Sequence, residues 1–422
     1  MRLIENGPSE LVLATPDDVI ELHTLNERWR RRLRLRELPF AITQAQTGQI
    51  SLQARNIAGF VQFGNIKLEI LPKFVADRIE LAGWRTALWN FLAFGEGLHL
   101  TESATGQFTE DDGLADLLAE LFLKAVAASH VLGFPMGYKE TSFTSRFLKG
   151  RLDPKSYGRL IPPNGKVTNL ASRLTTNVEA TQLLKWAGGE LARLVRNPGR
   201  RQALKQWQTL LPDVGSRAPL RRVYADTHRY PHLTDAFAIA QLLLRGESVN
   251  YGSGAAALPG FLWNSDTLFE AVCFRLFSTA VRPMGLSVDK PSLSLASGDG
   301  MRLSTIPDIL IQKSGVPVLS LDAKYKHLGG SAPRTSDVYQ VMAVGRVSGL
   351  SQVGLVYPSV GKTVTVRNMI PEGEGLPTSV HVVELGLESF VNADGIKLLQ
   401  TDITRWIKQQ VTLPETVDLV PT

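Results

Sequence analysis

Two carboxylates and a lysine stand within residues 306–326, in text that alternates like β-strands. Asp322 and Lys324 are two positions apart, and Asp308 lies one strand-like run earlier. Side chains on a strand alternate in direction, so Asp322 and Lys324 are expected on one face. The turn-like text at 313–315 predicts that the earlier run folds back and brings Asp308 beside them. Two carboxylates and an ammonium would then meet at one place.

Such a group suits the hydrolysis of a phosphodiester bond. Mg²⁺, or Mn²⁺, takes oxygen ligands, typically one or two carboxylates together with water and substrate phosphate. A nearby lysine can orient the nucleophile or neutralise charge that grows on the phosphate. The alternative is a solvated hairpin in which Lys324 only pairs with a carboxylate. Asp322 follows the apolar run VPVLSL, where a charge without a partner or metal is costly, and this favours the functional interpretation.

The text PD at 307–308 followed by DAK at 322–324 resembles the signature of PD-(D/E)xK nucleases. The longer text, PDIL, LDAKYK and DVYQVMAVG, is similar to McrC, the nuclease subunit of modification-dependent restriction systems. An earlier stretch, GNIKLEILPKF at 64–74, resembles the N-terminal half of that family. A further stretch, FLKGRLD at 147–153, falls where the family has similar text.

The resemblance implies roles for five residues. Asp308 and Asp322 would be metal ligands, and Lys324 would be the catalytic lysine. Glu270, in TLFEAVCFRLF, matches the helix acid that often completes such a metal site; the alternative is an ordinary helix-surface glutamate. Gln340, in the helix after the motif, matches a glutamine that related nucleases carry near the site; the alternative is a plain polar helix residue.

The function that the resemblance implies is a Mg²⁺-dependent (or Mn²⁺-dependent) endonuclease subunit of a restriction complex. It would cut double-stranded DNA and stimulate an AAA+ GTPase or ATPase of the McrB type through its N-terminal half. The chain's own GKT text at 361–363 lacks the first glycine of a phosphate-binding loop and predicts a hairpin turn, so NTP hydrolysis is expected from the partner. The alternatives are a catalytically silent regulatory or scaffold subunit and a stand-alone nuclease of this fold.

Composition narrows the class of protein further. The chain has 422 residues, is 44% hydrophobic and carries a formal net charge of +6, which permits contact with nucleic acid. Cys273 is the only cysteine, which excludes an internal disulfide and, with no export signal visible, favours a cytoplasmic protein. The longest apolar text, at 114–134, is interrupted by charges and predicts a core-facing helix, with no membrane span. The arginine-rich text at 28–37 is either a contact for phosphate or an acidic partner, or a solvated face.

The expected fold class is α+β with several domains. A β-rich α+β domain that binds the partner is predicted at 1–160, with short strands and turns over its first 75 residues. A helical middle region is predicted at 161–255, and a PD-(D/E)xK restriction-endonuclease-like α/β domain with a mixed sheet at 256–422. The helices predicted from apolar periodicity are 79–95, 112–130, 177–210, 233–246, 266–280 and 336–347.

Overall fold

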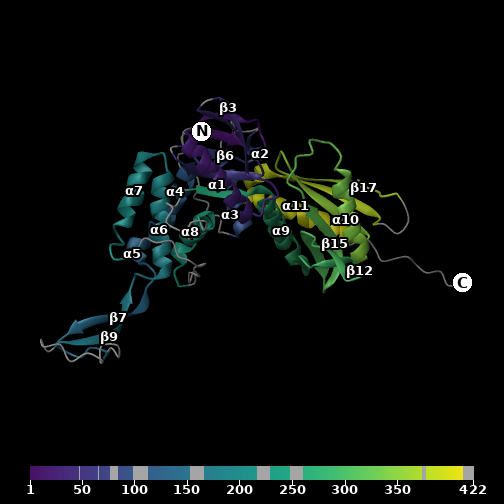
Figure 1. Ribbon diagram of the computed structural model, residues 1–422. Coiled ribbons are helices and arrows are strands. Elements are labelled where there is room, and N and C mark those ends of the chain that lie inside the picture. Colours follow the sequence, from purple (N-terminus) through teal and green to yellow (C-terminus); the bar gives the residue numbers. More distant parts are fainter. Residues whose placement is uncertain are drawn as a thin grey trace. The chain divides into compact units, whose positions relative to one another are not determined.

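The computed structural model describes residues 1–46, 48–64, 66–76, 84–97, 113–152, 166–215, 229–247, 260–372 and 377–411. The protein is a mixed α+β protein built as two compact units (Figure 1). The sheet unit combines Met1–Gln107 with Leu262–Thr422, and the helical unit is Phe108–Phe261. No helix in the described parts of the chain is both long and apolar enough to cross a membrane.

The largest sheet of the sheet unit has six strands in the order β11-β14-β15-β16-β18-β17. Its strands β14 and β15 are antiparallel, whereas β15, β16 and β18 run parallel, so the predicted mixed sheet is present. The bounds are β11 (Leu286–Asp289), β14 (Ile309–Lys313), β15 (Val316–Ala323), β16 (Gln352–Ser359), β17 (Val364–Met369) and β18 (Ser379–Gly386). A separate two-stranded sheet pairs β12 (Leu293–Gly298) with β13 (Met301–Thr305).

The connections of this sheet are partly as predicted. Ser314 and Gly315 have φ of 51° and 83°, so the predicted turn folds β14 back onto β15. The GKT text forms no hairpin turn, because β16 and β17 do not pair with each other; both pair with β18. Central strands β15, β16 and β18 are apolar over most of their length because they are buried in the sheet interior.

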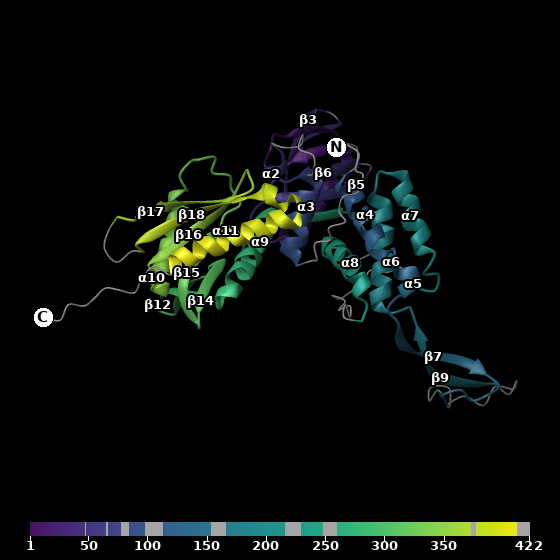
Figure 2. The ribbon, with the colours of Figure 1, turned by 180° about the vertical axis from the view of Figure 1, so that it is seen from behind.

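Three helices of the C-terminal segment frame the sheet, and Figure 2 shows them from behind. The predicted helix at 266–280 is α9 (Ser265–Val281), which begins where the Asn264 side chain accepts the N–H groups of Asp266 and Thr267. The predicted helix at 336–347 is α10 (Thr335–Ser348), which ends at Gly349 in the left-handed region. Helix α10 packs on β15 and β16, and α11 (Ala393–Val411) packs on α9.

The N-terminal segment, Met1–Gln107, contains three helices in its described residues and forms two small sheets, the first of which also includes β10 from later in the chain. The first sheet has the order β1-β6-β5-β10 and the second β2-β4-β3. The strand bounds are β1 (Arg2–Ile4), β2 (Glu10–Leu13), β3 (Phe40–Gln46), β4 (Gln49–Ala54), β5 (Ile57–Phe63), β6 (Ile66–Leu71) and β10 (Gly260–Asn264). The helix bounds are α1 (Pro16–Arg32), α2 (Lys73–Ala76) and α3 (Trp84–Glu96).

The prediction of only short strands over residues 1–75 is wrong at α1. Thr15 and Asp18 form a capping box, with Pro16 in the first helical turn, and this local chemistry starts a helix. Leu22 and Leu25 then bury one face of it. The arginine-rich text begins in the last turn of α1, where Trp29 is buried, so this text is partly a core-facing element.

The N-terminal segment is packed into the C-terminal segment of the same unit. Asn90 on α3 donates a hydrogen bond of 2.8 Å to the carbonyl of Phe390. Arg275 on α9 donates one of 3.0 Å to the carbonyl of Gly95, and a Cβ at Gly95 would lie 2.6 Å from a Leu268 methyl. The compact units therefore differ from the predicted ranges 1–160, 161–255 and 256–422, because α3 buries its apolar face against α9.

The helical unit holds five α-helices and a three-stranded sheet in its described residues. Its helices are α4 (Leu114–Val126), α5 (Ser129–Leu132), α6 (Glu179–Leu194), α7 (Pro198–Gln208) and α8 (Thr234–Glu247). The sheet has the order β7-β9-β8, formed by β7 (Gly137–Ser145), β8 (Arg151–Leu152) and β9 (Val167–Thr175). The predicted helix 177–210 is divided into α6 and α7 because Asn197 caps a new helix that starts at Pro198. The predicted helix 112–130 is divided into α4 and α5.

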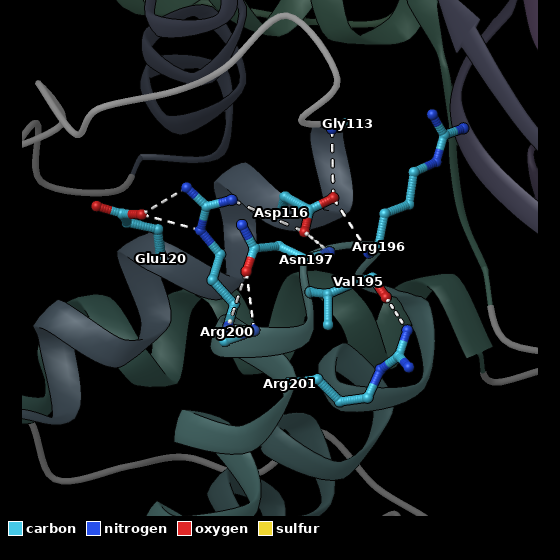
Figure 3. Close-up of polar contacts among 9 residues, drawn as sticks. Gly113, Asp116, Glu120, Val195, Arg196, Asn197, Arg200 and Arg201 are labelled. Atoms are coloured by element: carbon cyan, nitrogen blue, oxygen red, sulfur yellow. Dashed lines mark hydrogen bonds and ion pairs between the residues drawn. The ribbon is translucent and has the colours of Figure 1, made fainter.

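A buried carboxylate joins the start of α4 to the α6–α7 junction (Figure 3). Asp116 is fully buried and accepts hydrogen bonds from the backbone N–H groups of Gly113, Arg196 and Asn197 at 3.3, 3.3 and 3.0 Å. Arg200, in the first turn of α7, lies 3.9 Å from Asp116 and pairs with Glu120 at 3.0 Å. The helical unit is therefore fastened internally by one acidic side chain.

We expect Asp116→Ala to lower the free energy of unfolding of the helical unit by about 3 kcal/mol, because three backbone N–H groups lose a fully buried acceptor. Hydrogen exchange in the full chain, read on peptides from α4 and α6, measures the change. Glu179→Ala is the control, since Glu179 is an exposed acid in the first turn of α6. Equal exchange in both variants would contradict a fastening role for Asp116.

Candidate active site

Asp322, Lys324 and Gln340 form a closed set of contacts at the end of β15. Asp322 is 6% exposed, and the Lys324 ammonium forms an ion pair with its Oδ2 atom. Lys324 Nζ also donates a hydrogen bond of 3.1 Å to Gln340 Oε1. The amide of Gln340 in turn donates one of 3.2 Å to Asp322 Oδ1. Each of the three side chains thus fixes the other two.

Asp308 reaches the same place from the strand before. The antiparallel register pairs Ile309 with Leu321, which brings Asp308 opposite Asp322. Asp308 Oδ2 accepts a hydrogen bond of 2.8 Å from the Ala323 N–H. Its other oxygen lies 4.0 Å from Lys290 Nζ. The predicted convergence of Asp308, Asp322 and Lys324 is therefore present in the structure.

Glu270 on α9 is part of the same electrostatic group. Burial, followed by the charge of Asp308, raises the pKa of Glu270 to about 7. Burial and Asp308 also raise the pKa of Asp322 to about 6, while Lys324 opposes that shift. Three carboxylates therefore share one poorly solvated region, which argues against Glu270 as an ordinary surface residue.

The donor set can be compared with what Mg²⁺ requires. In the described chain, no three His, Cys, Asp or Glu side chains are gathered closely enough to hold a metal ion as they stand. The chemistry of the donors nevertheless fits, because carboxylate oxygens are the ligands that Mg²⁺ prefers. A bound cation would also offset the burial and the repulsion from Asp308 that raise the pKa values of Glu270 and Asp322. Side chains of Glu270, Asp308 and Asp322 would have to turn toward a common point.

The sequence analysis missed a second polar group beside the first. Asp337, in the first turn of α10, is buried and pairs with Lys326 at 3.1 Å. The Tyr357 hydroxyl donates a hydrogen bond of 3.4 Å to the same carboxylate. Asp337 stands three positions before Gln340, so a helix puts both on one face, and that spacing was the signal available in the sequence.

Comparisons with known proteins place the chain in context. The family model described as McrBC 5-methylcytosine restriction system component matches residues 52–358. No curated protein matches. The chain is similar to one in the half-complex of Thermococcus gammatolerans McrB AAA+ hexamers with bound McrC, with a TM-score of 0.68 and 17% identity over 97% of this chain and 99% of that one. At this identity the likeness shows a shared fold. A chain of the Thermococcus gammatolerans McrBC complex has a TM-score of 0.46 and 16% identity over 67% of this chain and 88% of that one.

The raised pKa of Glu270 predicts a pH-dependent effect of Glu270→Gln on stability. A carboxyl whose pKa is higher in the folded than in the unfolded protein costs stability as pH rises from the unfolded pKa to the folded one. Here that window ends at about 7. In chelator, Glu270→Gln should therefore stabilise the protein more at pH 8 than at pH 5.5, by about 2 kcal/mol.

The free energy of unfolding at the two pH values, from denaturant titrations, measures this difference. Glu179→Gln is the matched control, because Glu179 is exposed on the helical unit and the same chemical change should have no such pH dependence. A Glu270→Gln effect that is equal at both pH values would show that Glu270 is not held in the charged, poorly solvated region.

Proposed function

Because the chain belongs to the McrBC 5-methylcytosine restriction system component family, we propose that it is the DNA endonuclease subunit of an McrBC-type complex. The observation that carries this proposal is the convergence of Asp308, Asp322, Lys324 and Gln340 at the end of one buried strand. An ordinary strand pair has no need of a buried Asp322 whose pKa is raised by burial and by a second carboxylate, Asp308, beside it. Phosphodiester hydrolysis does need such a set.

The sheet unit would be the nuclease part of the protein. An antiparallel pair that carries the acids, followed by a parallel strand, supports a PD-(D/E)xK restriction-endonuclease-like arrangement of α9, β14, β15 and β16. Strand β15 places Asp322 near its C-terminal end. There α10 supplies Asp337 from its first turn and Gln340 from the next turn. The fold thereby positions Glu270, Asp322 and Gln340 from helices or strands, and Asp308 and Lys324 from positions next to strand ends.

Each residue has a proposed task in the reaction. Glu270, Asp308 and Asp322 would hold Mg²⁺ or Mn²⁺, which when bound polarises a phosphoryl oxygen and lowers the pKa of a bound water. Lys324 would stabilise the negative charge that grows on the scissile phosphate. Gln340 would orient Lys324, because its amide oxygen accepts from the ammonium while its amide nitrogen holds Asp322.

Double-stranded DNA is the proposed substrate, and a partner AAA+ NTPase of the McrB type is the proposed source of NTP hydrolysis. The similar Thermococcus gammatolerans structure contains McrB AAA+ hexamers with bound McrC. The helical unit offers a surface for such a partner, since its small sheet and the connection between β7 and β8 expose large apolar side chains to water. These are Tyr138, Phe147, Leu148 and Leu174, exposed by 78%, 74%, 60% and 52%. Figure 1 shows strands β7 and β9 at one end of this unit.

A catalytically silent regulatory subunit is the second candidate. The observation in its favour is that Lys324 occupies the Asp322 carboxylate and that no metal-ready acid cluster stands among the described residues. Such a subunit would activate the partner NTPase and use the nuclease-like sheet as a scaffold. Substitution of Lys324 separates the two candidates, because only the first predicts an effect on cleavage.

We expect Lys324→Ala to reduce metal-dependent DNA cleavage by about 100-fold or more, because charge on the scissile phosphate loses its stabilising ammonium. Stimulation of the partner's NTP hydrolysis should persist, since Lys324 belongs to the sheet unit and the proposed docking surface to the helical unit. Cleavage and NTP turnover are measured side by side, with Mg²⁺, Mn²⁺ or chelator.

Lys313→Ala is the control, as Lys313 is an exposed lysine at the turn between β14 and β15. Metal-dependent cleavage in the wild-type complex that is unchanged in Lys324→Ala would remove this site from the mechanism. If the wild-type complex never cuts but still stimulates NTP turnover, the silent regulatory subunit is the correct function.

A second test concerns the docking surface. The double variant Phe147→Ser with Leu148→Ser should weaken the apparent affinity for the AAA+ partner by about tenfold or more, since exposed apolar anchors dominate binding energy. Its thermal unfolding should match the wild type, because both side chains lie on the surface. Leu13→Ser is the control, an exposed leucine on the sheet unit. An equal loss of affinity in the control would place the docking surface elsewhere.

A further inference from the structure

A lysine from the N-terminal segment reaches the residue that follows Lys324. Lys73 opens α2 within the LPKF text, and its Nζ atom donates a hydrogen bond of 2.5 Å to the Tyr325 carbonyl. The same ammonium lies 4.0 Å from the centre of the Tyr325 ring. One side chain thus holds both the backbone and the ring of Tyr325, across a separation of 252 positions in the sequence.

A buried glutamate completes this contact. Glu5, just after β1, is 1% exposed, and its Oε2 atom accepts hydrogen bonds of 3.2 Å from the Lys73 N–H and the Tyr325 hydroxyl. Burial raises the pKa of Glu5 to about 7, opposed by Lys73, and burial lowers the pKa of Lys73. Burial of charged groups is costly, so stability alone does not explain why a buried carboxylate and a half-buried ammonium lie near each other here.

The contact acts on a short stretch of backbone that lies beyond the sheet. Strand β15 ends at Ala323, whose N–H is held by Asp308. The Lys324 N–H donates to the Val356 carbonyl at 2.8 Å, and the Lys326 N–H donates back to the Lys324 carbonyl at 2.7 Å. The Tyr325 carbonyl accepts its hydrogen bond from Lys73. The turn is therefore also held by the N-terminal segment.

Aromatic packing anchors the same residue. Tyr325 is 4% exposed, and its ring lies 5.7 Å from that of Phe269 on α9 and 6.2 Å from that of Phe74, the neighbour of Lys73. The N-terminal segment and α9 therefore meet on the tyrosine next to Lys324.

We propose that Lys73 and Glu5 are positioning residues that set the backbone of Tyr325 and thereby the reach of Lys324. This inference rests on the proposed nuclease function. Neither residue touches the proposed reacting atoms; both act through the turn at 324–326. Lys324 Nζ has to meet Asp322, Gln340 and a phosphate within a narrow range, and small displacements of a catalytic group are costly to rate.

The first test is Lys73→Met, which keeps most of the side-chain length and removes the ammonium. At saturating DNA and metal, we expect the cleavage rate constant to fall by about 10- to 100-fold. The metal concentration for half-maximal cleavage should stay within about twofold of wild type, because the carboxylates are not displaced. Hydrogen exchange of peptides covering 322–328 should accelerate, while peptides from β18 keep their wild-type rate.

A compensated variant separates positioning from stability. Lys73→Met leaves the Glu5 carboxylate buried beside a lost cation, so it can lower stability for that reason alone. Lys73→Met combined with Glu5→Gln removes both charges and should restore the thermal unfolding midpoint without restoring cleavage. Lys67→Met is the matched control, a lysine on β6 six positions earlier, and should cut at the wild-type rate.

The outcomes distinguish this inference from the proposed function. Cleavage by the compensated variant at the wild-type rate, or unchanged exchange of 322–328 in both variants, would overturn the positioning role. If the wild-type protein does not cut with its partner, the proposed function fails, and the exchange measurement still decides whether Lys73 fixes the turn. Accelerated exchange in every peptide of both variants would show a global structural role and would also overturn it.

Discussion

Asp322 is buried at the end of β15, and the surrounding elements supply the groups that compensate its lost hydration. A carboxylate on a central strand, flanked by β14 and β16, needs compensation that water cannot give. Lys324 supplies a charge and Gln340 a hydrogen bond, so the strand end and α10 are locked into one arrangement. Asp308 adds a second negative charge, so Lys324 compensates the charge of this group only in part. A region that is compensated in part is one in which a cation can bind favourably.

A second consequence is that the turn at 324–326, next to the candidate active site, contacts residues distant in sequence. Lys73 and Glu5 approach Tyr325 only because α3 and the β1-β6 sheet are packed into the same unit as α9. The hydrogen bond from Asn90 to Phe390 and that from Arg275 to Gly95 keep this packing in register. The N-terminal segment thus supports the backbone beside the candidate active site.

The sequence predicted what local periodicity controls. The hairpin that joins Asp308 to Asp322 followed from alternation and from the turn at 313–315, and the helices around Glu270 and Gln340 followed from apolar spacing. Helix α1 was missed although its capping box is visible at Thr15. The contact of Glu5 with Tyr325 leaves no periodic signal, because tertiary packing alone brings the two together. The predicted boundary between residues 255 and 256 lies outside the described residues.

The order of the two units along the chain also decides how the proposed DNA cleavage and the proposed partner activation can be tested separately. The helical unit is inserted between two segments of the sheet unit, so the chain enters and leaves the sheet unit around it. A fragment that stops near residue 255 would lose α9, against which α3 buries its apolar face, and η5 (Leu387–Val391), to which Asn90 donates. Truncation would therefore expose core residues of the N-terminal segment and confuse instability with loss of function. Point substitutions at the turn after β15 and on the β7–β9 surface leave both cores intact, and only they can show that the two activities belong to different units.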